Sequence, residues 1–261
     1  MPRATFFLTS NPAVGAENVS TDGSRFEVNL TNDLSIPAGA SDIEMCVSQA
    51  AIWNVSPNVA AGFGNNRFRY TTSTAPAGVY DVLIPDGLWS LTGLGSYLST
   101  QFVNNGHSAS LFKLSGQDST QQSVITIATA GDSVQLASAP NSVGSLLGFT
   151  ADVLAPVANF NAFSQGIARL NRNNSYTIQS NICDGLVVNR ATSGVIAAIP
   201  IDAPPGSQIN FDPRQLTWIP CPELRGVSRT RLTFQLGNQD LQPTPTSGEF
   251  YTFIVQLRWQ V

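Results

Sequence analysis

The sequence predicts an all-β protein, a jelly-roll β-sandwich that carries an inserted helix and hairpin. Short stretches of alternating apolar and polar residues recur along the chain, separated by clusters of Gly, Pro, Asn and Ser at irregular intervals of roughly ten to fifteen residues. A length of 261 residues is enough to bury a substantial core in one large β domain. One segment in the first half breaks this rhythm with the spacing of a helix.

Four strands are predicted before that segment. Residues 25–30 alternate cleanly between polar and apolar side chains, which is typical of a strand with one buried face. The other three strands of this half are predicted at 43–55, 66–72 and 79–84. Residues 1–24 are polar and rich in turn-forming residues, so we expect an N-terminal arm or edge segment that reaches a neighbouring chain or the interior of an assembly.

The inserted segment is predicted at residues 85–165. Its apolar side chains fall on one helical stripe, at Leu91, Leu94, Leu98 and Phe102. Ser90 is placed to cap this helix, whereas Gly93 and Gly95 each weaken it by up to about 1 kcal/mol, so the helix needs a sheet to pack against. A hairpin (110–114 and 123–128), a strand (133–136), a short helical turn capped by Ser142 and ending at Gly148, and a loose stretch (151–166) follow.

Strands resume after the insertion. They are predicted at 175–182, 195–201, 208–211, 216–219, 229–236 and 250–259. Proline-rich turns at 202–206 and 242–248 force the chain to reverse. Residues 25–84 and 166–261 are therefore assigned to the jelly roll. Two small sandwiches, 1–150 and 151–261, remain an alternative.

Charged residues make up only 11% of the chain, and the formal net charge is −4. Twelve of the thirteen basic residues are arginine, with Lys113 as the single lysine. Arginine suits contacts between proteins, although drift in genome composition produces the same bias. The nearest approach to a basic cluster is Arg225, Arg229 and Arg231, of which the last two are expected on one strand face, facing solvent or another subunit. Sequence-specific nucleic-acid binding is not expected.

The N-terminal residues lack the apolar core of a signal peptide, and no eighteen apolar residues run together. We therefore expect no membrane span and a chain that stays inside the cell unless another component exports it. Three scattered cysteines, Cys46, Cys183 and Cys221, are too few for a disulfide framework and are expected to be reduced and buried.

Catalytic and cofactor sites are not expected. The single histidine, His107, lies in a polar stretch and is interpreted as a surface-loop residue. A carboxylate site for Ca²⁺ or Mg²⁺ requires Asp81 and Asp86, or Asp118, to meet in space, and no EF-hand spacing is present. The pair Gly93 and Gly95 lacks the third glycine and the context of a phosphate-binding loop.

Two alternatives stay open from the residues. A jelly-roll hydrolase needs two carboxylates roughly 5 to 9.5 Å apart in a groove. A carbohydrate- or receptor-binding sandwich needs an exposed aromatic platform beside polar groups in one cleft. The four tryptophans, which are expected in the core or in subunit contacts instead, are Trp53, Trp89, Trp218 and Trp259.

The order of motifs resembles a viral family. Ile84-Pro85-Asp86-Gly87, the helix, the hairpin and Leu146-Leu147-Gly148-Phe149 follow one another as in the minor capsid, or penton, proteins of virophages, Polinton-like viruses and related tailless icosahedral viruses. The final third is similar as well. The segments that carry this likeness are 178–182, 194–201, 209–213, 232–236 and 248–253. The similarity covers residues 75 to 261, and no motif is diagnostic alone.

The resemblance implies a structural capsid protein rather than an enzyme. It implies a jelly roll that forms a homopentamer at the fivefold vertices of a virion, contacts the major capsid protein, and is assembled inside the host cell. The family offers no catalytic, cofactor or metal residues to transfer. The sequence shows no long spike domain. The resemblance therefore gives no basis for expecting this chain to bind a receptor.

Overall fold

The computed structural model describes all residues except 171–172, 183–186, 189–190 and 193. The chain divides into two compact units. One unit joins Met1–Ser56 to Asn173–Val261, and the other is Pro57–Arg172. Among the described residues, no helix is long and apolar enough to span a membrane.

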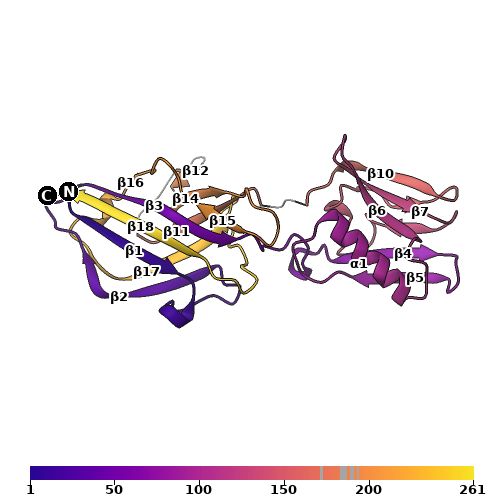
Figure 1. Ribbon diagram of the computed structural model, residues 1–261, viewed down its shortest axis with the longest axis horizontal. Coiled ribbons are helices and arrows are strands. Elements are labelled where there is room, and N and C mark those ends of the chain that lie inside the picture. Colours follow the sequence, from indigo (N-terminus) through magenta and orange to yellow (C-terminus); the bar gives the residue numbers. More distant parts are fainter. Residues whose placement is uncertain (171–172, 183–186, 189–190, 193) are drawn as a thin grey trace. The chain divides into compact units, whose positions relative to one another are not determined.

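The first unit is a sandwich of two antiparallel sheets (Figure 1). The first sheet has the order β1 (Arg3–Thr9), β18 (Thr252–Gln260), β3 (Ser41–Trp53), β15 (Gln208–Phe211), with β16 (Ile219–Pro220) also paired to β3. The second sheet has the order β14 (Val195–Pro200), β11 (Ser175–Ser180), β17 (Ser228–Asn238), β2 (Arg25–Ser35). A separate two-residue pair joins β12 (Val187–Val188) to β13 (Ala191–Thr192).

The strand order is that of a jelly roll. If the eight long strands β1, β2, β3, β11, β14, β15, β17 and β18 are counted in chain order, the two sheets read 1-8-3-6 and 5-4-7-2. This interleaving of the two halves of the chain is the double Greek key expected of a jelly roll. The predicted all-β jelly-roll sandwich is therefore confirmed.

The sandwich core forms where the inner faces of the two sheets meet. On β17, Leu232, Phe234 and Leu236 point inward and are buried, because side chains alternate along a strand. The ring of Phe234 lies 5.1 Å from that of Phe253 on β18 and 5.6 Å from that of Phe26 on β2. Burying each such ring stabilises the fold by roughly 1.5–3 kcal/mol.

The second unit contains two further sheets and the long helix. One sheet has the order β5 (Gly78–Leu83), β4 (Arg67–Thr72), β8 (Ser133–Gln135), β9 (Val153–Leu154). The other has the order β10 (Phe160–Ile167), β7 (Gln122–Ile127), β6 (Phe112–Gln117). The helix is α1 (Leu91–Asn104). Four 3₁₀ turns complete the described elements of the chain: η1 (Pro12–Val14), η2 (Ala61–Phe63), η3 (Val143–Ser145) and η4 (Pro222–Leu224).

Helix α1 follows the sequence pattern. The hydroxyl of Ser90 accepts a hydrogen bond from the Gly93 amide at 3.0 Å, which caps the helix. Leu94, Leu98 and Phe102 are buried in the core of the second unit. A Cβ atom at Gly95 would lie 2.9 Å from the carbonyl oxygen of Leu114 on β6, so glycine permits the helix to approach that strand closely.

The unit boundaries differ from the predicted ones. Strands β4 and β5, assigned from sequence to the jelly roll (25–84), belong to the inserted unit because β4 pairs with β8. The insertion is thus Pro57–Arg172 rather than 85–165. The N-terminal segment (1–24), expected as an arm or an edge segment, contains β1, which is the edge strand of the first sheet and pairs along its length with β18 of the same chain.

A second difference concerns the stretch predicted to be loose. Its end, Phe160–Ile167, forms β10 and pairs with β7. Ala162 and Ser164 point inward and are buried, while Phe163 and Gln165 are exposed. The buried positions are occupied by small or polar residues, so the strand lacks the apolar periodicity from which strands are predicted in a sequence.

Candidate interaction surfaces

The outer face of the first sheet is partly apolar. Phe7 on β1 lies opposite Ile254 on β18, and Ile254 lies opposite Gln49 on β3. The Phe7 side chain is 69% exposed although it sits in a regular strand. The short side chain of Ala51 lies among larger neighbours on this face, beside a groove of about 300 Å³. Exposed apolar surface of this kind is typical of protein contacts.

A cation–π contact lies on the same face, further along the strands. Arg258 on β18 donates from Nε to Glu44 Oε2 at 2.8 Å, and its Cζ lies 3.9 Å from the ring centroid of Trp218. The ion pair and the stacking hold one guanidinium in a fixed place. The first sheet therefore presents an apolar groove and an anchored arginine.

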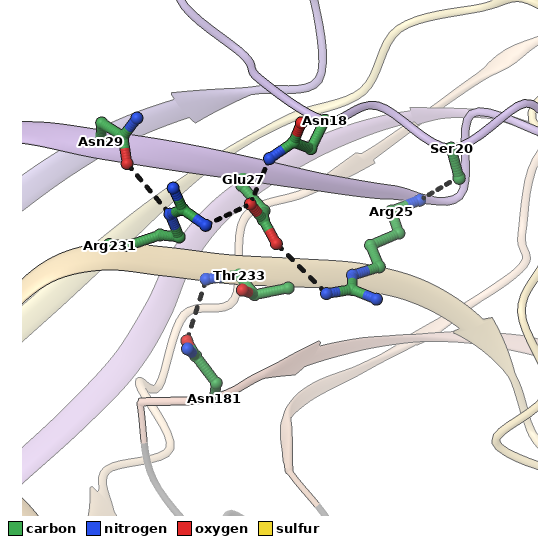
Figure 2. Close-up of polar contacts among 8 residues, drawn as sticks. All are labelled: Asn18, Ser20, Arg25, Glu27, Asn29, Asn181, Arg231 and Thr233. Atoms are coloured by element: carbon green, nitrogen blue, oxygen red, sulfur yellow. Dashed lines mark hydrogen bonds and ion pairs between the residues drawn. The ribbon is translucent and has the colours of Figure 1, made fainter.

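The outer face of the second sheet is polar and internally paired. Figure 2 shows Glu27 on β2 between the guanidinium groups of Arg25 and Arg231. The N–O distances of these two ion pairs are 3.2 and 3.4 Å. Asn29 accepts from Arg231 Nε at 3.2 Å, which ties β2 to β17 a second time. Both arginines are about half exposed, so they remain accessible.

Glu27 is held in its charged form. Asn18 donates from Nδ2 to Glu27 Oε2 at 2.6 Å, and this hydrogen bond is the main cause that keeps the pKa of Glu27 below its ordinary value. Burial opposes the shift, while Arg231 and Arg25 add to it. The network fixes the local geometry of this face.

Arg229 and Arg231, predicted to share a strand face, both lie on β17 two positions apart, and the pairing of β17 with β2 shifts register between them. Arg229 lies opposite Leu34, and Arg231 lies opposite Asn29, with the irregularity between them. Arg225 lies apart, after η4. The irregularity adds residues to β2 and not to β17, and of the three arginines only Arg225 lies outside the strand.

In the inserted unit, the outer face of the β5-β4-β8-β9 sheet has a charged centre. Asp81 on β5 accepts from Arg69 at 2.7 Å to each carboxylate oxygen, and Arg67 lies 3.6 Å from the same carboxylate. The hydrogen bonds from Arg69 hold the pKa of Asp81 below its usual value. The exposed side chains of Val79, Leu83 and Leu154 belong to strands of the same sheet.

A larger groove of about 740 Å³ opens elsewhere in the inserted unit. Its walls come from the start of α1, the β6–β7 hairpin, η3 and the end of β10. Its charged lining residues are Asp118 and Arg169, and Leu91, Leu146 and Ile167 supply apolar surface. A second groove of about 500 Å³ between α1 and β6 is lined by Lys113.

His107 is not a surface residue, contrary to the sequence-based prediction. Its side chain is 6% exposed and makes edge contacts with Tyr80 at 4.8 Å and Tyr70 at 5.7 Å between ring centroids. Neither ring nitrogen has a hydrogen-bond partner among the described residues. The polar sequence around it gave no signal of burial, because the aromatic neighbours come from β4 and β5.

The candidate metal carboxylates serve other contacts. Asp81 binds arginine, and Asp86 accepts a hydrogen bond from the Ala61 amide at 2.8 Å. Asp118 lines the 740 Å³ groove. In the described part of the chain, no three His, Cys, Asp or Glu side chains gather as metal ligands. The 740 Å³ groove has one carboxylate, and the groove on the first sheet also has one, Asp212.

The tryptophans occupy different settings. Trp259 packs against the sandwich core and Trp89 against the core of the inserted unit. Trp53 is exposed, and Trp218 stacks on Arg258. The two grooves of the inserted unit have no aromatic ring in their walls.

Cys46 and Cys221 are both buried, as predicted, and burial raises the pKa of the Cys46 thiol. Cys183 lies outside the described residues.

Comparison with known proteins adds a structural relationship. No family model matches the chain, and no curated protein matches its sequence. The crystal structure of the selenomethionine-labelled mavirus penton protein superposes on it with a TM-score of 0.50 and 8% identity, covering 100% of each chain. The fold is similar to that of this penton protein. At 8% identity, the likeness to the mavirus penton protein concerns the fold, and it includes the inserted unit as well as the jelly roll.

Proposed function

We propose that the chain is a structural capsid protein, the penton that forms a homopentamer at the vertices of an icosahedral virion. The observation that carries this proposal is the full-length similarity in fold to the mavirus penton protein. Its action would be assembly, with contacts to identical copies and to a major capsid protein inside the host cell. Modest pairwise energies add around a closed ring.

The apolar outer face of the first sheet supports a contact role. Phe7, Ile254 and the groove over Ala51 offer a shape into which a neighbour's side chain fits. Apolar surface with arginine nearby is the composition enriched at the centres of protein interfaces. We assign this face, rather than the paired polar face around Glu27, to contact with a second copy or with the major capsid protein.

The oligomeric mass tests the proposal. A pentamer of the 27.8 kDa chain has a mass of about 139 kDa, which light scattering coupled to size-exclusion chromatography measures directly. Co-expression with the major capsid protein, followed by imaging of particles, would locate the chain on a symmetry axis. A strict monomer at tens of micromolar that also fails to join particles would overturn the vertex role.

A matched pair of variants tests the assigned face. Phe7→Ser removes the exposed ring on the first sheet, while Val14→Ser removes a side chain of similar exposure, 69% against 67%, that is not in a strand. We expect Phe7→Ser to weaken assembly by about tenfold or more and Val14→Ser to leave it unchanged. Equal effects would remove this face from the interface.

A further inference from the structure

The 740 Å³ groove of the inserted unit plays no part in the proposed assembly. Its volume lies within the range of small-ligand sites, which combine apolar walls with a few converging polar groups. All of its lining residues belong to the inserted unit, from Asn65 to Leu170. The groove is therefore a candidate binding site in its own right.

The two charged side chains of the groove are unengaged. The carboxylate of Asp118 and the guanidinium of Arg169 have no hydrogen-bond or ion-pair partner within the described part of the chain, whereas Asp81 and Glu27 are paired elsewhere. One negative and one positive group give the groove no net charge. A ligand of high charge would leave one of them repelled, so the pair favours a neutral ligand.

The amide side chains make the groove rich in acceptors. Gln117, Gln121 and Gln122 direct their NH₂ groups back to the chain, to Ser119 Oγ, the Asp118 carbonyl and the Ser164 carbonyl at 3.3, 2.8 and 2.6 Å. Their carbonyl oxygens accept no hydrogen bond from the described residues, so they are available as acceptors beside the Asp118 carboxylate. A ligand that satisfies them must carry several donors.

We propose that this groove binds a neutral carbohydrate. Sugar hydroxyls both donate and accept: adjacent hydroxyls donate to Asp118 and the glutamine oxygens, and another accepts from Arg169. Leu91 and Ile167 provide the apolar surface on which the C–H face of a pyranose ring rests. The groove offers aliphatic side chains where many sugar-binding sites have an aromatic ring, so we expect one site to bind weakly, with a dissociation constant on the order of millimolar. Several copies in an assembly would then bind more tightly through avidity.

Saturation-transfer difference NMR on the full chain tests the site. The probes are lactose, mannobiose and N,N′-diacetylchitobiose, with 3′-sialyllactose as a charged comparison and an uncharged Ser-Asn octapeptide as a polypeptide comparison. We expect transfer to at least one neutral disaccharide and weaker transfer to the sialylated sugar and the peptide.

Variants locate the binding. Asp118→Ala and Arg169→Ala each remove one exposed group and are expected to weaken binding by about tenfold, the loss typical of a hydrogen bond to a charged group. Lys113→Ala is the matched control: it removes a charge from the neighbouring groove, which shares Leu91 and Gly116 with the 740 Å³ groove, but Lys113 does not line the 740 Å³ groove itself, so we expect no effect.

Any one of three results would overturn the proposal. The first is no saturation transfer to any neutral sugar, the second is transfer that is unchanged in both groove variants, and the third is a preference for the peptide or the sialylated sugar. The oligomeric mass is measured separately. A chain that assembles but binds no sugar refutes the groove alone, and one that binds sugar as a monomer refutes the assembly alone.

Discussion

Replacing Gly148 by alanine should selectively destabilise the inserted unit. Gly148 has φ of +83°. An added Cβ would lie 2.8 Å from the Ile167 carbonyl oxygen and closer still to that of Gly166, inside the approach that real Cβ atoms reach. The two backbones meet here because the Gly166 amide donates to the Gly148 carbonyl at 2.9 Å. A side chain at residue 148 forces them apart.

Gly131→Ala separates the two causes of this loss. Gly131 has the same φ of +83°, but nothing lies within 4 Å of an added Cβ. Left-handed strain costs each variant roughly 1–2 kcal/mol, and overlap adds about 1–3 kcal/mol in Gly148→Ala only. The gain from a less flexible unfolded chain is about 0.4–1 kcal/mol for both and cancels in the comparison.

The assay is hydrogen–deuterium exchange on the full chain. Peptides from β7 and β10 report on the inserted unit, and peptides from β17 provide an internal reference in the jelly roll. We expect faster exchange in β7 and β10 of Gly148→Ala than of Gly131→Ala, with β17 unchanged. Equal exchange in the two variants would show that backbone conformation alone, and not the close approach to Gly166, explains the glycine.

Three further predictions concern the inserted unit. Leu98→Ala in the buried stripe should lower the free energy of unfolding by about 2–5 kcal/mol, and Val103→Ala on the exposed face by less than about 0.5 kcal/mol, in urea titrations; comparable losses would contradict the assigned faces. His107→Phe should raise stability by about 1 kcal/mol, because it keeps the ring and removes two unpaired nitrogens, and a lower melting temperature would argue against this reasoning. The lowered pKa of Asp81 means that its ion pair stabilises the fold fully well above pH 3.8, the ordinary carboxyl value, and progressively less as the pH falls below it. Arg69→Ala should reduce the stability that is lost as the pH falls, and for so exposed a pair this loss is at most about 1 kcal/mol. Thermal unfolding measured from pH 7 to pH 2 tests this. If the variant and the unchanged protein lose the same stability in acid, the Arg69–Asp81 pair is not the source of the loss.

Sequence periodicity predicted the elements whose packing is local. The stripe through Leu94 and Phe102 and the cap at Ser90 correspond directly to α1, because helix spacing and capping depend on neighbours within a few residues. The alternation at Arg25 likewise predicted the start of β2. The jelly-roll class followed from the number and spacing of such strands.

Other features depend on contacts between distant segments. Residues 3–9 form a strand only through pairing with β18, and their neighbours in sequence are polar turns. The burial of His107 depends on Tyr70 and Tyr80, which are separated from it by more than a helix. The groove of Asp118 and Arg169 brings together a hairpin and the end of β10, and no spacing in the sequence links them.

The position of β18 has a consequence for how the chain is made. It lies between β1 and β3, so the first sheet stays divided until β18 has left the ribosome. The inserted unit is a continuous stretch, Pro57–Arg172, and every one of its strand partners has emerged long before that. We therefore expect the insertion to acquire its structure first during synthesis. The sandwich, whose strand pairing joins segments from both ends of the chain, forms last and more slowly.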